Sequence, residues 1–358
     1  MKILSLGAGA IGTYIGGSLA KAGHSVTFVE QPAVVDLLNK SGLTLDLSLD
    51  PRRQAGPRFT LKPPAVTFSA SLADSLTILR PDLILFALKS FDTQSALKTL
   101  APLYHSIFSG ADAPPVLCLQ NGVENEAALA AALGAQNVIA ATVTSAIGRR
   151  PGGEIVLEKL RGVGVAAGHP LSAQIARALN EALLNGQIFP RAADMKWSKL
   201  LTNLLANPAS AILDLPAAEI FAHPGLYRLE IAQLRECLAV MRAQHINVVD
   251  LPGTPVRALA LAARLPAWLS KPFLAKAAGA GRGAKMPSFH IDLYAGRKQS
   301  EVLFLHGAVA RFGKKLGVPT PVNQFLTDTL LALSAGRLPL DTYAHQPEKF
   351  LQAAETHA

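Results

Sequence analysis

The 358-residue sequence has few cysteines and few charged residues, and both scarcities narrow the classes of protein it can belong to. Its two cysteines, Cys118 and Cys237, stand far apart in apolar surroundings, so we interpret them as small core residues of a protein kept in a reducing compartment. No redox motif and no zinc-ligand spacing is present, so no metal is expected. Charged residues make up 16% and hydrophobic residues 50% of the chain, which is typical of a compact globular protein.

Long hydrophobic runs are also missing. No apolar stretch reaches the roughly 18 residues needed to cross a bilayer, and the first strand-like segment follows the initiating methionine without a leader. We therefore expect a cytoplasmic protein with no membrane partner. The formal net charge is +9, but the basic residues are scattered and have no interleaved aromatic residues, so nucleic acid is not expected as a partner. The positive net charge can be explained by anionic ligands such as a dinucleotide and a carboxylate substrate.

Residues 1–30 have the pattern of strand, glycine turn, helix and strand. We expect Gly7 to allow a tight turn, Gly9 to let the backbone approach a pyrophosphate, and Gly12 to let the helix lie close to the sheet. A glycine pattern carries weight only in such a context, and here a second strand follows that ends in the acidic Glu30. The sequence thus predicts a Rossmann-type dinucleotide site. Its turn comprises Gly7, Ala8, Gly9, Ala10, Ile11 and Gly12.

Residues 1 to about 190 alternate strand-like apolar runs with helical patterns, which predicts a parallel sheet flanked by helices. Lys89 and Asn121 follow two of the expected strands. Because ligands of open parallel sheets bind beyond the carboxyl ends of strands, we expect both residues to face the cofactor. A short hairpin is expected within 42–67. The further strands are expected at 83–87, 115–119, 138–142, 154–157 and 162–166.

From about Asp194 to about Ala335 the apolar period is helical, which predicts an all-α second domain. The expected helices cover 195–213, 226–245, 255–278, 289–296 with 301–316, and 321–334. The segment 255–278 is apolar and basic; we interpret it as a packed helical hairpin, with a homodimer contact or a membrane surface as alternatives. The predicted division is a dinucleotide-binding domain at 1–190, a helical substrate and dimerisation domain at 191–340, and a tail at 341–358.

A polar file occurs in the run KWSKLLTNLLAN, where Lys199, Asn203 and Asn207 stand four residues apart. A continuous helix would carry them along one otherwise apolar face. A buried amide without a partner costs about 1–3 kcal/mol, so such a file indicates groups that bond each other or face a polar ligand. A lysine beside two amides can donate to a carbonyl oxygen and hold a carboxylate, as reduction of a 2-oxo acid requires. The alternative is a solvated stripe on a helix.

Four motifs together resemble the ketopantoate reductase (2-dehydropantoate 2-reductase) family over nearly the whole length of the chain. They are GAGAIG near the N-terminus, the pair Asn121–Gly122, the run KWSKLLTNLLANP, and PSFHIDLYAGRKQSE ending at Glu301. The resemblance implies a Rossmann domain followed by a helical domain. It further implies NADPH-dependent reduction of 2-dehydropantoate to pantoate, in pantothenate and coenzyme A synthesis.

The resemblance also implies roles for individual residues. Lys199 would be the general acid, and Glu301 would orient a substrate hydroxyl or hold the lysine in place. Asn121 would meet both the nicotinamide and the substrate. The other implied substrate contacts are Asn203, Asn207 and Ser288.

Two features depart from the family pattern. Glu30 stands where many members have a basic residue, and a carboxylate there can accept a hydrogen bond from a ribose 2′-hydroxyl but repels a 2′-phosphate. We expect NADPH nevertheless, because Lys89 and the positive net charge favour a phosphate, with NADH as the alternative. Beyond Glu301, Leu303 replaces a common Asp and His306 replaces the Asn of a common Asn-Gly pair. We interpret His306 as a packing or hydrogen-bonding residue outside the site.

Two other functions stay open. The first is a reductase or dehydrogenase for another branched 2-oxo acid. The second is a non-catalytic nucleotide-sensing protein that retains the Rossmann fold. The joint presence of the catalytic and substrate residues favours an enzyme, because a sensor would have no need of a proton donor.

Overall fold

The computed structural model describes residues 1–54, 56–150, 153–271, 274 and 286–357. The chain forms two compact units. Unit 1 comprises Met1–Gln120, Glu124–Lys196 and Leu251–Thr254; unit 2 comprises Asn121–Val123, Trp197–Asp250 and the chain from Pro255 onward. The helix α7 (Ala192–Leu204) contributes residues to both units.

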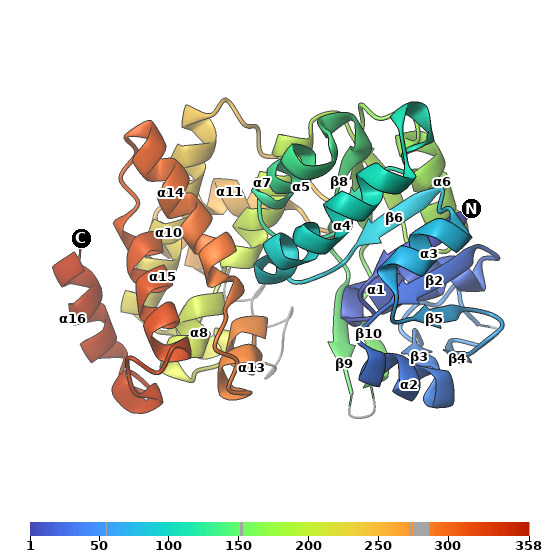
Figure 1. Cartoon of the computed structure of the whole chain (residues 1–358). Helices are drawn as coiled ribbons and strands as arrows, with labels where there is room; N and C mark the ends of the chain where they lie inside the picture. The colour runs from blue at the N-terminus through green and yellow to red at the C-terminus, as the bar shows by residue number, and fades with distance from the viewer. Residues whose placement is uncertain (55, 151–152, 272–273, 275–285, 358) are drawn as a thin grey trace. The chain divides into compact units, whose positions relative to one another are not determined.

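Unit 1 is built on an eight-stranded sheet (Figure 1). The strand order is β12-β11-β8-β7-β6-β1-β2-β5, and every neighbouring pair is parallel except β8 and β11. The expected α/β class with a parallel sheet is confirmed, and β8 with β11 is the one antiparallel pair. The bounds are β1 (Lys2–Leu6), β2 (Ser25–Val29), β5 (Thr67–Ser69), β6 (Leu83–Phe86), β7 (Val116–Cys118), β8 (Val138–Val143), β11 (Val163–Ala166) and β12 (Gly186–Phe189).

Helices cover both faces of this sheet, so its central strands are apolar at successive positions. In β1, Ile3 packs in one core with α1 (Ala10–Lys21) and α6 (Ser172–Glu181). Its neighbour Leu4 packs in a second core with α3 (Leu72–Leu79), α4 (Thr93–Ile107) and α5 (Asn125–Leu133). Cys118 lies fully buried in this second core, as expected from its apolar surroundings.

A smaller sheet extends the first core, in the strand order β4-β3-β10-β9. Its strands β3 (Leu43–Asp46) and β4 (Arg58–Leu61) are antiparallel, which confirms the predicted hairpin. The strands β9 (Ala146–Arg149) and β10 (Ile155–Lys159) complete it. The small sheet packs closely against α1 at Gly17, because a β-carbon on that residue would press on the side chain of Leu45 in β3. The helix α2 (Pro32–Ser41) follows β2.

The regular secondary structure in the described residues of unit 2 is all helical. The helix α10 (Pro224–Ala243) packs against α9 (Ala217–Ala222), α11 (Val256–Arg264), α14 (His306–Leu316), α15 (Pro321–Ser334) and α16 (Pro347–His357). The helix α8 (Asn207–Leu213) packs against α13 (Ser288–Tyr294) and α15. Cys237 is fully buried within α10. None of the described helices is long and apolar enough to span a membrane.

The predicted helix at 195–213 is wrong, because the chain breaks between α7 and α8. Ala206 has a left-handed backbone, with φ of 52°. Pro208 gives the reason: it has no N–H to donate to the carbonyl of Leu204, and it is tolerated in the first turn of a new helix, where it lies in α8. The proline was visible in the sequence, but the apolar period continues across it and suggested one helix.

The predicted helix at 255–278 is also shorter than expected. Among described residues, α11 ends at Arg264, and a new helical turn begins after Pro266. Residues 272–273 and 275–278 of the predicted segment lie outside the described part of the chain. The tail folds back on unit 2 through α16, where the buried Phe350 packs on Phe325 with ring centroids 5.2 Å apart.

Candidate functional site

The glycine turn between β1 and α1 has the form that the sequence predicts. Gly7 has φ of +97°, which favours glycine. A β-carbon on Gly12 would overlap the carbonyl oxygen of Gly7, so only glycine lets α1 lie this close to the turn. Apart from Gly9 and its two neighbours in the chain, no described residue comes within 4 Å of a β-carbon built on Gly9, so the backbone there is open to a ligand. The turn and the N-terminus of α1 therefore fit the pyrophosphate of a dinucleotide.

Glu30 points at this turn. It directly follows β2, and its Oε1 accepts a hydrogen bond of 2.5 Å from the backbone N–H of Ala8. The carboxylate consequently lies beside the predicted phosphate-binding residues instead of pointing into solvent. A negative charge held at this place acts directly on any phosphate that approaches the turn.

The loops after β6 and β7 are tied together by a buried amide. Gln120 Nε2 donates to the backbone oxygens of Leu88 and Lys89, each at 3.0 Å. Since β6 is the neighbour of β1, Lys89 stands beyond the carboxyl end of a strand next to the glycine turn. Lys89 is half-buried and lies at the switch in strand order, and its cofactor role stays a prediction.

Sequence reasoning missed Lys196, which is 4% exposed. Its Nζ donates to the backbone oxygens of Gln120 at 2.6 Å and Ala141 at 3.2 Å, and it pairs with Glu126 Oε1 at 2.7 Å. Burial lowers the pKa of Lys196, but the Glu126 carboxylate outweighs burial and raises it, so the ammonium stays charged. Lys196 thus holds the residue that directly precedes Asn121.

In unit 2 the structure brings two predicted residues together. Asn203 Nδ2 donates to Asn121 Oδ1 at 3.1 Å. Lys199 lies four residues earlier on α7, one turn from Asn203 on the same side of the helix. Two motifs that are 82 positions apart in sequence therefore meet at an amide pair.

Asn207 does not continue the polar file, because it begins α8 beyond the break. It is 5% exposed and bonds backbone groups: Nδ2 donates to the Asn203 carbonyl at 3.3 Å, and Oδ1 accepts from the Phe289 N–H at 3.2 Å. Phe289 follows Ser288, so Asn207 secures the start of α13. The predicted substrate role of Asn207 stays a prediction.

Glu301 and His306 lie on consecutive short elements. Glu301 begins the 3₁₀ turn η5 (Glu301–Phe304) and is 5% exposed, and His306 begins α14 and is fully buried. His306 Nε2 is 2.8 Å from Gln233 Oε1. Burial lowers the pKa of His306 to about 3, against the opposing effect of the Leu204 carbonyl. The interpretation of His306 as a hydrogen-bonding residue is confirmed.

The lowered pKa predicts a stability change with pH. The unfolded chain binds a proton at His306 near pH 6.5 and the folded chain only near pH 3, so this stabilisation is complete above pH 6.5 and is lost as the pH falls towards 3. Between about pH 7 and about pH 5, urea unfolding should show the wild type losing about 2 kcal/mol more than His306→Gln. Equal losses in both proteins would contradict a neutral buried imidazole.

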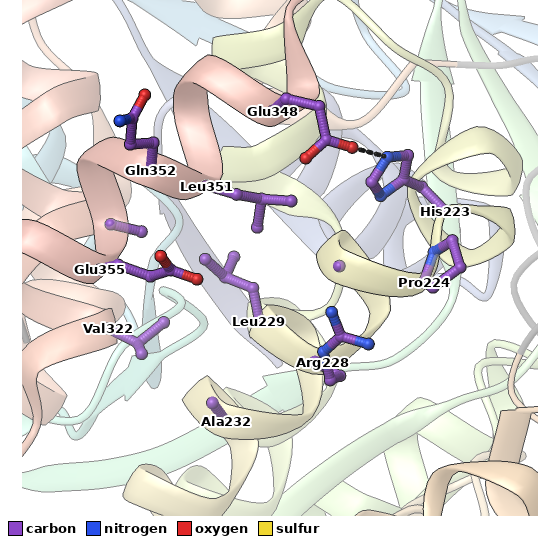
Figure 2. A pocket seen from close by; sticks show the side chains of 12 residues that line it. His223, Pro224, Arg228, Leu229, Ala232, Val322, Glu348, Leu351, Gln352 and Glu355 are labelled. Carbon is purple, nitrogen blue, oxygen red and sulfur yellow. Dashed lines mark hydrogen bonds and ion pairs between the residues drawn. The ribbon is translucent and has the colours of Figure 1, made fainter.

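A cavity of about 550 Å³ lies elsewhere in unit 2, between α10, the start of α15 and α16 (Figure 2). His223 and Glu348 face each other at its rim, with Nε2 and Oε1 3.2 Å apart. None of the predicted site residues lines this cavity. The cavity is therefore separate from the residues of the predicted site.

Two protein-family models match this chain. The model of the family described as ketopantoate reductase PanE/ApbA matches residues 3–167, and the model of its C-terminal part matches residues 191–334. The 2-dehydropantoate 2-reductase of Pyrococcus horikoshii is 24% identical over 332 residues, which is 91% of this chain and 95% of that protein.

Solved structures share the fold. A PanE/ApbA family ketopantoate reductase from Ralstonia eutropha has a TM-score of 0.76 and 26% identity, over 94% of this chain and 99% of that one. The ternary structure of D-mandelate dehydrogenase with NADH and anilino(oxo)acetate has a TM-score of 0.73 and 21% identity, over 95% and 99%. At that identity the second likeness concerns the fold alone.

Proposed function

Because the chain belongs to the ketopantoate reductase family, an oxidoreductase family that uses a nicotinamide cofactor, we propose that it reduces 2-dehydropantoate to pantoate with NADPH, in pantothenate and coenzyme A synthesis. The observation that carries the proposal is the Asn121–Asn203 amide pair, one helical turn from Lys199. We further propose that unit 1 binds the dinucleotide and that unit 2 binds the oxo acid. The units change between Lys196 and Trp197, close to the predicted domain boundary at residue 190.

The reduced nicotinamide would supply the hydride that adds to C2 of the oxo acid. The remaining chemistry falls to residues of this chain. An alkoxide develops at the former carbonyl oxygen, and the ammonium of Lys199, a residue of α7, would protonate it. Asn203 would bind the substrate with the amide geometry that its bond to Asn121 sets. Glu301, which is buried, would orient a substrate hydroxyl, and Ser288 would add a further contact.

The choice between NADPH and NADH depends on Glu30 in this proposal. Its carboxylate lies on the Ala8 N–H, where it can accept from a ribose 2′-hydroxyl and repels a 2′-phosphate. Lys89 and the net charge of +9 act in the opposite direction. We propose NADPH as the preferred donor and NADH as a competent second donor, in line with the NADH bound by D-mandelate dehydrogenase.

The variant Glu30→Arg tests this balance. We expect the ratio of kcat/KM for NADPH over NADH to rise about tenfold or more, because a repelling carboxylate is replaced by a guanidinium that pairs with phosphate. The control is Asp36→Arg, which makes the same charge change at an exposed position on α2. A ratio that rises equally in both variants would assign the effect to overall charge and not to Glu30.

A substrate panel tests the function. The wild type is mixed with NADPH, then with NADH, and with 2-dehydropantoate, other branched 2-oxo acids and aryl 2-oxo acids, while the absorbance of the reduced nicotinamide is followed. We expect the highest kcat/KM with 2-dehydropantoate. A higher value with another oxo acid would favour the second candidate, a reductase for that acid. No oxidation with any member would favour a nucleotide sensor.

A further inference from the structure

The break between α7 and α8 leaves backbone groups in the interior that a continuous helix would have paired. Pro208 cannot donate to the Leu204 carbonyl, and the left-handed Ala206 turns its N–H out of the helical pattern. Buried backbone groups of this kind are nearly always satisfied by other partners. The partners here come from α10.

Two side chains of α10, both fully buried, bind the break. Glu230 Oε2 accepts from the Ala206 N–H at 2.7 Å. Gln233 Nε2 donates to the same carboxylate oxygen at 2.5 Å and lies 3.4 Å from the Leu204 carbonyl. The two residues are three positions apart on one helix, so both side chains reach the same turn.

His306 completes this group from α14. Because the Gln233 amide directs its N–H₂ to the Glu230 carboxylate, its oxygen faces His306 and must accept. His306 therefore carries its proton on Nε2 and donates at 2.8 Å. This amide orientation and this tautomer are inferred from the order of bonds that runs from Ala206 through Glu230 and Gln233 to His306. We call these three side chains the buried polar network.

We propose that the buried polar network positions the substrate-binding residues of unit 2 by fixing the α7–α8 break. The inference rests on the proposed function, because it takes Asn203, Ser288 and Glu301 as substrate contacts. His306 is a positioning residue and does not touch the substrate.

Each of those three residues is linked to the network through a few residues of chain or a single hydrogen bond. Asn203 lies in the last turn of α7, three residues before Ala206. Asn207 directly follows Ala206 and bonds the N–H of Phe289, the residue after Ser288. Glu301 begins the turn that leads into His306. A displacement of the break would therefore move Asn203, Ser288 and Glu301 together.

The test compares two substitutions of His306. His306→Phe keeps an aromatic ring but removes the donor, and His306→Gln keeps an N–H₂ donor at similar reach. We expect His306→Phe to raise KM for 2-dehydropantoate about tenfold or more and to lower kcat, while Kd for NADPH stays within about twofold. His306→Gln should restore KM to within about threefold of the wild type. Gln233→Met, which keeps the side-chain length, is expected to match His306→Phe and replaces it where that variant does not fold.

The control is His223→Gln, a histidine of unit 2 at the rim of the separate cavity, which should leave KM unchanged. Wild-type KM and kcat in folded His306→Phe, or a loss in His306→Gln as large as in His306→Phe, would overturn the proposal.

Failure of the proposed function gives a different result, since the wild type itself would then reduce no 2-dehydropantoate. In that case the same comparison is made with whichever 2-oxo acid the wild type reduces. For a protein without turnover, coupling between His306→Phe and Glu230→Gln in urea unfolding supports the network, and its absence overturns it.

Discussion

Replacement of Lys199 by alanine is expected to lower kcat by about 10²-fold or more, the size of a general-acid contribution, with little change in Kd for the dinucleotide. Lys199 is the ammonium one helical turn from the Asn121–Asn203 pair. In the proposed mechanism, this substitution removes the proton donor to the developing alkoxide. Steady-state kinetics with 2-dehydropantoate and a separate dinucleotide titration measure the two quantities.

Two further variants show whether the proton or the charge matters. Lys199→Arg keeps the positive charge, but a guanidinium with a pKa above about 12 does not release a proton, so its kcat should be nearly as low as that of Lys199→Ala. Lys314→Ala removes an exposed lysine from the last turn of α14 and should have wild-type kinetics. Near wild-type turnover in Lys199→Ala would remove Lys199 from the mechanism.

The second large effect is expected on stability. Lys196→Met keeps most of the side-chain volume but leaves the partly buried Glu126 carboxylate without its ammonium partner. Breaking one side of a buried ion pair costs about 3–5 kcal/mol. We expect a loss of that order in the free energy of unfolding, measured by urea at neutral pH. The Gln120 carbonyl loses its donor as well, so the folded variant should also bind the oxo acid more weakly through Asn121.

The double variant Lys196→Met/Glu126→Gln separates charge from packing. Because it removes both charges, it should recover a large part of the lost stability. Lys314→Met is the matched control at an exposed lysine and should change the free energy of unfolding by less than about 0.5 kcal/mol. A loss below about 1 kcal/mol in Lys196→Met, or no recovery in the double variant, would show that the pair contributes little.

The strands and helices that were predicted well are those whose local pattern agrees with their final environment. The apolar runs at β1, β6, β7, β8 and β11 were expected within two residues of their observed bounds, because strands buried on both faces are largely apolar. The strand β10 was expected within the same margin, although it alternates between buried and partly exposed residues. The strands β5 and β12 were not expected. Each lies at an edge of the large sheet, where partial exposure weakens the apolar signal.

The predicted site divides in the same way. The glycine turn depends on three close residues, so its shape followed from their spacing. The polar file was correct for Lys199 and Asn203 but wrong for Asn207, since Pro208 breaks the helix between them. Glu230 and Gln233 were overlooked, although both stand at helical spacing on the face of α10 that Leu226 and Cys237 define as apolar, which was a usable signal. Lys196 was overlooked because its partners come from other elements.

The sequence by itself determined the α/β class of the first part and the helical class of the second, the shape of the glycine turn, and the presence of a lysine one helical turn before an amide, because each depends on local residue patterns. Only the tertiary structure decided that Glu30 turns its carboxylate to the Ala8 N–H, that Asn203 meets Asn121, and that His306 is neutral and bonded to Gln233. These last features depend on partners 22, 82 and 73 positions away. Burial and hydrogen-bond satisfaction select such partners once the chain has folded, and no local pattern records that selection.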